Sequence, residues 1–119
     1  MTNRKFAGVL SLLGALSLLA ISGCASKYVQ AAVRNQTSGA VTLVEVDYPS
    51  ASFGKETLPA GAEYDYRFKI LGSGPAKVLW TDSHHQQHEV AGPQLNEGQQ
   101  GTLIVTLTES GASWDKQLR

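Results

Sequence analysis

Residues 28–119 predict an all-β domain, a small antiparallel β-sandwich that is immunoglobulin-like in the loose sense and has six or seven short strands. Three observations predict this fold. Apolar and polar residues alternate with a period of two in several segments, and turn-forming residues separate these segments about every 8 to 12 positions. No apolar stripe with the helical period follows residue 23. A partly open barrel is the alternative architecture.

Two strands are predicted at the start of this domain. The first covers residues 28–35, and the turn-forming residues 35–39 lead from it into a second strand at 41–48. The apolar face of the first strand consists of Val29, Ala31 and Val33. Apolar and acidic residues alternate in the second half of the second strand, so its apolar side also faces the core.

The longest irregular stretch, residues 49–62, allows two interpretations of Phe53. In the first, the stretch is an interaction loop and Phe53 is its exposed aromatic anchor, because loops on rigid scaffolds often carry binding residues. In the second, residues 52–57 form a short edge strand and Phe53 packs into the sandwich. We favour the second interpretation.

The clearest strand signal lies at residues 63–70, where charged and apolar residues alternate without interruption. The charged face consists of Glu63, Asp65, Arg67 and Lys69. The apolar face consists of Tyr64, Tyr66, Phe68 and Ile70. With Trp80 and Tyr48, this apolar face is expected to supply most of the aromatic core.

Three further strands are predicted towards the C-terminus. Residues 76–82 place Val78 and Trp80 on one face, residues 87–91 form a weaker strand, and residues 101–109 alternate again. The inward residues of the last strand are Leu103, Val105 and Leu107. The glycine-rich stretch at 92–101 serves turns, with Leu95 filling one end of the core.

The segment 82–89 holds all three histidines of the chain, which are His84, His85 and His88. Either an extended strand or a turn brings two imidazoles together, and Zn²⁺ and Cu²⁺ favour nitrogen ligands. A closed metal site, however, needs three or four ligands that are fixed by further hydrogen bonds. A polar hairpin tip that faces water is therefore the simpler interpretation, and metal binding is the alternative.

The sequence offers no arrangement of residues that is typical of an enzyme. The serines lie in no nucleophile-elbow pattern, and the carboxylates fall singly on the polar faces of strands, not in pairs suited to acid–base catalysis. We therefore expect a non-enzymatic protein without a cofactor.

The N-terminal segment has the features of a secretory signal peptide. Arg4 and Lys5 precede an apolar run from Phe6 to Ile21, which is too short for a transmembrane helix of about 20 residues. Small residues end the run. We therefore predict that residues 1–23 are a helical signal peptide that is removed after export.

The chain has one cysteine, Cys24, and it follows this run directly. The sequence Ile21-Ser22-Gly23-Cys24 resembles the lipobox of bacterial lipoproteins, with an aliphatic residue, two small residues and the modified cysteine. The resemblance implies a diacylglyceryl thioether on Cys24 and an N-linked acyl chain such as palmitate. A single unpaired thiol in an oxidising compartment is otherwise a liability, so lipidation accounts for both its number and its position.

The lipobox implies a location in the cell envelope. In Gram-negative lipoproteins an Asp after the cysteine often signals inner-membrane retention, and Ala25 stands there instead, which favours the outer membrane facing the periplasm. Residues 24–27 are then the lipidated N-terminus with a short tether. Fully extended, the chain from Cys24 to Tyr28 reaches at most about 14 Å. The start of the first strand is therefore expected to face the bilayer.

The charge of the predicted mature chain excludes one class of partner. Of the ten basic residues, Arg4 and Lys5 leave with the signal peptide, so eight remain against ten acidic ones. No basic cluster is visible along the sequence, which argues against nucleic acid and also against electrostatic adhesion to anionic lipid. We therefore predict a membrane-anchored envelope lipoprotein that is a protein-interaction or structural module. The alternative is a periplasmic metal-binding protein that uses the three histidines.

Overall fold

The computed structural model describes residues 27–119, and these residues form eight strands and no helix. The strands are β1 (Val29–Asn35), β2 (Val41–Tyr48), β3 (Ala51–Leu58), β4 (Glu63–Phe68), β5 (Gly74–Thr81), β6 (Gln87–Leu95), β7 (Gly101–Thr108) and β8 (Gly111–Leu118). The predicted all-β sandwich is confirmed, with eight strands instead of six or seven. The predicted signal peptide and Cys24 lie outside the described residues. Within residues 27–119 no helix is present that could cross a membrane.

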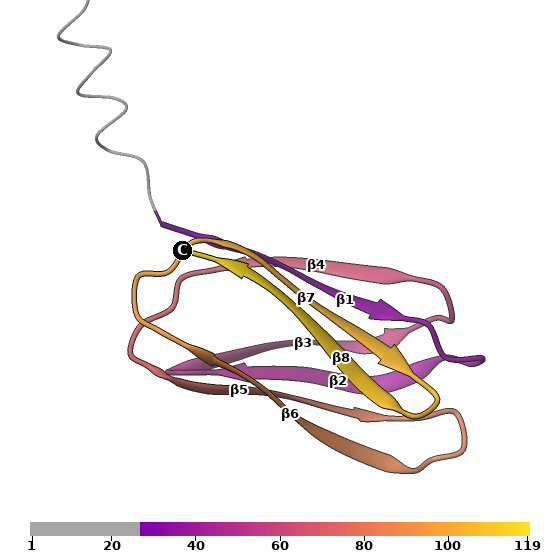
Figure 1. Ribbon diagram of the computed structural model, residues 1–119. Helices are drawn as coiled ribbons and strands as arrows, with labels where there is room; N and C mark the ends of the chain where they lie inside the picture. The colour runs from indigo at the N-terminus through magenta and orange to yellow at the C-terminus, as the bar shows by residue number, and fades with distance from the viewer. Residues whose placement is uncertain (1–26) are drawn as a thin grey trace, which may run out of the picture.

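The strands form two four-stranded sheets that face each other (Figure 1). Sheet A has the order β4-β1-β7-β8, and sheet B has the order β3-β2-β5-β6. All neighbouring strands are antiparallel except β1 and β7, which are parallel. This pair differs from the purely antiparallel sandwich that we expected. It is possible because the long segment between β1 and β7 crosses between the sheets, which gives the chain the crossover that a parallel pair requires.

The core lies between the sheets and consists mainly of valine and leucine with a few large aromatic residues. The alternation predicted from the sequence holds in β1, β5 and β7, where every second residue is buried, and in the second half of β2, where Val44 and Val46 are buried. Trp80 is 2% exposed, and Leu95 fills one end of the core as predicted. Burial of this apolar surface is the main force that holds the sheets together.

Asn35, at the end of β1, is a buried polar residue whose hydrogen bonds are satisfied. Its Nδ2 donates to the carbonyl oxygens of Gly39 and Leu58, each at 2.9 Å. Its Oδ1 accepts from the backbone N–H of Thr37 at 3.0 Å and from the Thr37 hydroxyl. The side chain thus closes the predicted turn at 35–39 and ties it to the end of β3.

An aromatic cluster closes the sandwich where the edge strands β3 and β4 approach each other. Phe53 lies at its centre, with ring centroids 4.6 Å from Tyr66, 5.7 Å from Phe68 and 6.3 Å from Tyr64. Phe53 is 6% exposed, so it is an inward residue of a strand and not the anchor of an interaction loop. The expectation that Tyr66 is buried is wrong, because this ring lies at the open edge and is 38% exposed.

The loops gather at two ends of the sandwich, because the strands run along its long axis (Figure 1). We call the end that carries Lys27 the near end. It also holds the loops at 69–73 and 96–100 and the last residue, Arg119. The opposite, far end holds the connections at 36–40, 59–62, 82–86 and 109–110.

Candidate functional site

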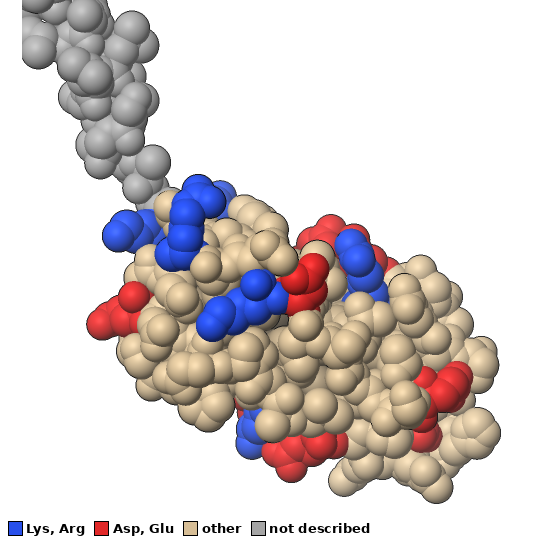
Figure 2. All heavy atoms as spheres, viewed as in Figure 1, with Lys and Arg blue, Asp and Glu red and all other residues tan. Residues whose placement is uncertain are grey.

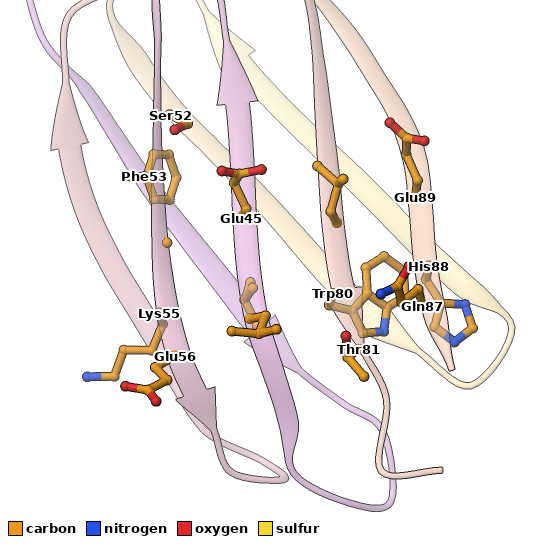
Figure 3. Close-up of a pocket in the computed structure, with 14 residues that line it drawn as sticks. Glu45, Ser52, Phe53, Lys55, Glu56, Trp80, Thr81, Gln87, His88 and Glu89 are labelled. Atoms are coloured by element: carbon orange, nitrogen blue, oxygen red, sulfur yellow. The ribbon is translucent and has the colours of Figure 1, made fainter. Parts of the chain in front are cut away.

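A hollow with a volume of about 760 Å³ lies on the outer face of sheet B. All four strands of the sheet contribute to it (Figure 3). We call this hollow the outer groove. The side chains that line it include Leu43, Glu45, Ser52, Glu56, Leu79 and Glu89, together with Lys55, Thr81, Gln87 and His88.

The strand register explains why these residues share one face. Val44 and Val46 are buried, so Glu45 between them points outward, and Leu79 points outward between Val78 and Trp80. Glu45 pairs with Gly54 on one side and with Leu79 on the other, and Leu79 pairs with Glu89. A row of outward positions therefore crosses the sheet from β3 to β6.

A β-bulge at Leu43 shapes the floor of the outer groove. The pairing of β2 with β5 shifts between Thr42 and Glu45, so β2 contains one residue more than its partner. Leu43 adopts a positive φ of 50° and is 65% exposed. A bulky side chain rarely adopts this backbone region, and such strained residues cluster at functional sites. The bulge also increases the local twist, which curves the sheet.

Gly54 leaves a gap in the row of side chains on β3. A Cβ atom at this position would overlap the carbonyl oxygen of Val44 on the neighbouring strand. Only glycine therefore fits this close approach of the two backbones. With no side chain at this position, the groove remains open between Ser52 and Glu56.

The outer groove is mainly acidic. Within residues 27–119, Glu45 and Glu56 take part in no ion pair, whereas Glu89 lies 3.1 Å from the Nζ of Lys77. The hydrogen bond to Glu89 and the charges of both Glu89 and Asp47 raise the pKa of Lys77. Lys55 borders the groove, but its Nζ lies over the ring of Tyr64, at 5.5 Å from the centroid. The more distant charge of Glu45 also contributes to the raised pKa of Lys77. The groove thus presents two carboxylates without a direct ion pair, Glu45 and Glu56, beside two leucines.

The three histidines lie on or beside the hairpin between β5 and β6. His84 and His85 are exposed, and His85 has a positive φ of 64° in the turn. The ring of His88 stacks on Trp80 with a centroid distance of 4.8 Å, and its Nε2 lies 2.7 Å from Oδ2 of Asp82. In residues 27–119 no group of three or more His, Cys, Asp or Glu side chains is placed to hold a metal ion. A metal at His88 Nε2 would have to displace Asp82, and the metal hypothesis stays a prediction.

Asp82 organises this hairpin, and its charge makes the stability of the folded protein depend on pH in the acid range. The hydrogen bond from His88 is the largest cause that lowers the pKa of Asp82 from its ordinary value of 3.8 to about 2, and the backbone N–H of Gln86 and the backbone N–H of His84 add to it. Because the folded-state pKa is depressed, the stabilisation is complete above the unfolded-state pKa. It is lost as the pH falls from about 4 towards 2.

We expect Asp82→Asn to be less stable than the unchanged protein above about pH 4 and to approach it near pH 2. Urea denaturation of both proteins across this range measures the difference in unfolding free energy. Glu63, whose pKa is also lowered, contributes equally to both proteins and cancels in this difference. The hydrogen bond from the backbone of Ser38 lowers the pKa of Glu109 and the Asp82 charge raises it in part, so the contribution of Glu109 changes together with that of Asp82 and belongs to the measured difference. A difference that does not change with pH would show that the Asp82 charge does not stabilise the hairpin.

The outer groove was not among the sites predicted from the sequence, although the sequence contains one signal of it. Residues 41–48 alternate only in their second half, and Leu43 is the residue that breaks the pattern. An apolar residue out of phase in a strand indicates a bulge or an exposed contact residue. The pairing that sets Glu45 beside Gly54 and Leu79 requires the sheet order, which the sequence does not contain.

Comparisons with known proteins support the fold. No family model matches the sequence, and no curated protein matches it. Among solved structures, the NMR structure of a protein from Eubacterium rectale is similar, with a TM-score of 0.55 and 14% sequence identity. The match covers 75% of this chain and 87% of that chain. At this identity the similarity shows a shared fold alone.

Proposed function

We propose that this protein is a non-enzymatic envelope lipoprotein, anchored through lipid on Cys24, whose sandwich binds an extended basic segment of a partner protein in the outer groove. The observation that carries the proposal is the groove itself, a hollow of about 760 Å³ in which Leu43 is 65% exposed beside unpaired carboxylates. The lipid anchor is supported by the lipobox at residues 21–24.

The chemistry of the groove selects the kind of partner. Glu45 and Glu56 would attract Lys or Arg side chains, and opposite charges across an interface steer association and fix register. Leu43 and Leu79 offer apolar contact area between these charges. A shallow hollow that crosses the four strands of sheet B suits an extended segment, because alternate side chains of such a segment point towards the sheet.

The position of the groove is compatible with membrane attachment. The groove lies on the side of the sandwich, over sheet B, whereas the chain enters at the near end (Figure 1). A partner in the groove would therefore run beside the domain without passing between the domain and the bilayer. Because the tether after Cys24 is short, such a partner should itself lie close to the membrane.

Photo-crosslinking in the native envelope tests this proposal. A photoreactive residue at position 52 faces the outer groove, and the same residue at position 113 faces the outer surface of sheet A, so Ser113 is the matched control for Ser52. We expect an adduct from position 52 only, joined to a partner peptide that contains Lys or Arg. Equal adducts from both positions, or an adduct from position 113 alone, would show that the groove is not the binding site.

Leu43→Asn separates binding from folding. Asparagine tolerates positive φ better than leucine, so the unfolding free energy should not fall. Loss of the contact that Leu43 would bury against the partner should nevertheless weaken partner binding about tenfold or more.

The double variant Glu45→Gln with Glu56→Gln should also lower the adduct yield, whereas Asp65→Asn with Asp115→Asn on sheet A should not. Unchanged adduct yield in Leu43→Asn would remove this residue from the site.

A further inference from the structure

The near end gathers basic residues that are far apart in the sequence. Lys27, Arg67, Lys69 and Arg119 are all exposed. They come from the chain before β1, from the end of β4 and the loop after it, and from the residue after β8. In Figure 2 the blue side chains concentrate around the point at which the described chain begins. Our expectation that no basic cluster remains is therefore wrong, because the fold brings these residues together.

Backbone pairing fixes these cations in one row. Val29 pairs with Phe68, the N–H of Gly101 donates to the carbonyl oxygen of Tyr28, and Gln100 and Arg119 exchange two hydrogen bonds of 3.0 Å. The row therefore follows the end of sheet A from β4 to β8. Neighbouring strands are about 4.8 Å apart, so it spans about 14 Å.

Tyr28 holds two of these cations in place. The Arg67 guanidinium carbon lies 3.7 Å from the centroid of the Tyr28 ring, and the Nζ of Lys69 lies 4.9 Å from it. Both distances are typical of cation–π contacts. The ring thus brings two positive charges together at the position where the chain enters the fold.

An exposed apolar residue accompanies the charges. Leu71, in the loop between β4 and β5, is 58% exposed. The loop is anchored on either side of Leu71. Ile70 is buried and its carbonyl oxygen accepts from the N–H of Gly98 at 3.1 Å, and the hydroxyl of Ser73 accepts from the N–H of Glu97 at 3.1 Å. Basic residues, a tyrosine and an exposed leucine on one surface are the composition that binds at the interface of an anionic bilayer.

The two ends differ in charge. Glu97 is the acidic side chain in the near-end loops, against the four cations. At the far end lie Asp82, Glu109 and Glu63, and there Arg34 is paired with Glu63 at 2.6 Å. A negative surface would therefore attract the near end and repel the far end.

We infer that the near end is a docking surface for the headgroups of an anionic bilayer, in which Lys27, Arg67, Lys69 and Arg119 contact the lipid charges and Leu71 enters the interface. The inference rests on the membrane attachment proposed above and adds a second, electrostatic contact to it. This contact fixes the orientation of the domain, because it holds the end of sheet A against the membrane and leaves the outer groove on the side.

Lysine acylation of the full chain on vesicles tests the inference. The protein is reconstituted in vesicles of phosphatidylcholine alone or of phosphatidylcholine mixed with phosphatidylglycerol, and co-floatation is measured first. Mass spectrometry then measures the acylation rate of each lysine. We expect Lys27 and Lys69 to be protected on the anionic vesicles only, and high salt to remove this protection. Lys55 and Lys77, which lie on sheet B, are internal controls that should react equally on both.

A pair of arginine variants provides the matched comparison. Arg67→Gln with Arg119→Gln removes two cations without removing a reporting lysine, and it should lower the protection of Lys27 about fivefold for each charge. Arg34→Gln, at the far end, should leave that protection unchanged. Co-floatation with both vesicles but equal acylation of Lys27 and Lys69 on both would refute headgroup docking and leave the anchor standing. A chain that floats with neither vesicle would overturn the anchor and the docking surface together.

Discussion

Replacing Phe68 with alanine is expected to lower the free energy of unfolding by about 3 to 5 kcal/mol. Phe68 ends β4, is 4% exposed, and its ring centroid lies 4.1 Å from that of Tyr48 and 5.7 Å from that of Phe53. Truncation removes apolar contacts with both sheets and leaves a cavity that β4, an edge strand, can only partly close. Urea denaturation followed by tryptophan fluorescence measures the change.

Two further variants make this result interpretable. Lys69→Ala, at the adjacent exposed position, should change the unfolding free energy by less than about 0.5 kcal/mol. Phe68→Leu keeps most of the volume and should cost less than about 1.5 kcal/mol, so it reports on the site even if the alanine variant does not fold. Equally small effects of Phe68→Ala and Lys69→Ala would mean that the inward face of β4 is misassigned.

The fold could be predicted because a period of two survives in most strands. A half-buried strand needs an apolar residue at every second position. In residues 63–70, 76–82 and 101–109 this alternation is visible directly in the sequence. For the irregular stretch at 49–62, the favoured interpretation was an edge strand at residues 52–57 with Phe53 inward. The structure places Phe53 on β3, which extends this segment to Ala51–Leu58.

The eighth strand was not predicted, because its inward face is weakly apolar. The strand β8 alternates Ala112, Trp114, Lys116 and Leu118 on one side, and Lys116 interrupts the apolar pattern. At the open edge between β8 and β6 this lysine donates from its Nζ to the carbonyl oxygen of Gln94 at 2.8 Å. An edge strand tolerates such a residue, because one end of its side chain still reaches solvent.

The candidate surfaces could not be predicted, because each depends on which strands are neighbours. The outer groove needs Glu45 beside Gly54 and Leu79, and the near end needs Lys69 and Arg119 at opposite sides of one sheet end. Glu45 and Leu79, like Lys69 and Arg119, are separated by more than 30 residues of sequence. A count of charges along the chain therefore missed the basic cluster, which the parallel pairing of β1 with β7 brings together.

Changing Cys24 to serine is expected to have the largest effect on location, because it would release the protein from the membrane. Two or three acyl chains hold a protein stably on a bilayer, whereas a single chain holds it marginally, and the serine variant would carry none. The basic near end alone should not replace this anchor, since its contacts are screened by salt. Incorporation of labelled palmitate and partition into a detergent phase measure the loss.

Ser22→Ala is the matched control for this change. Alanine keeps the small residue that the lipobox resemblance requires at this position, so labelling and partition should be as in the unchanged protein. If Cys24→Ser still takes up palmitate and enters the detergent phase, the anchor lies elsewhere in the chain. The lipid would then no longer keep the near end close to the bilayer. The orientation of the domain inferred from Lys27 would lose its support. If the variant becomes soluble while its sandwich still binds the same partner segment, anchor and groove are separate functions of one small domain.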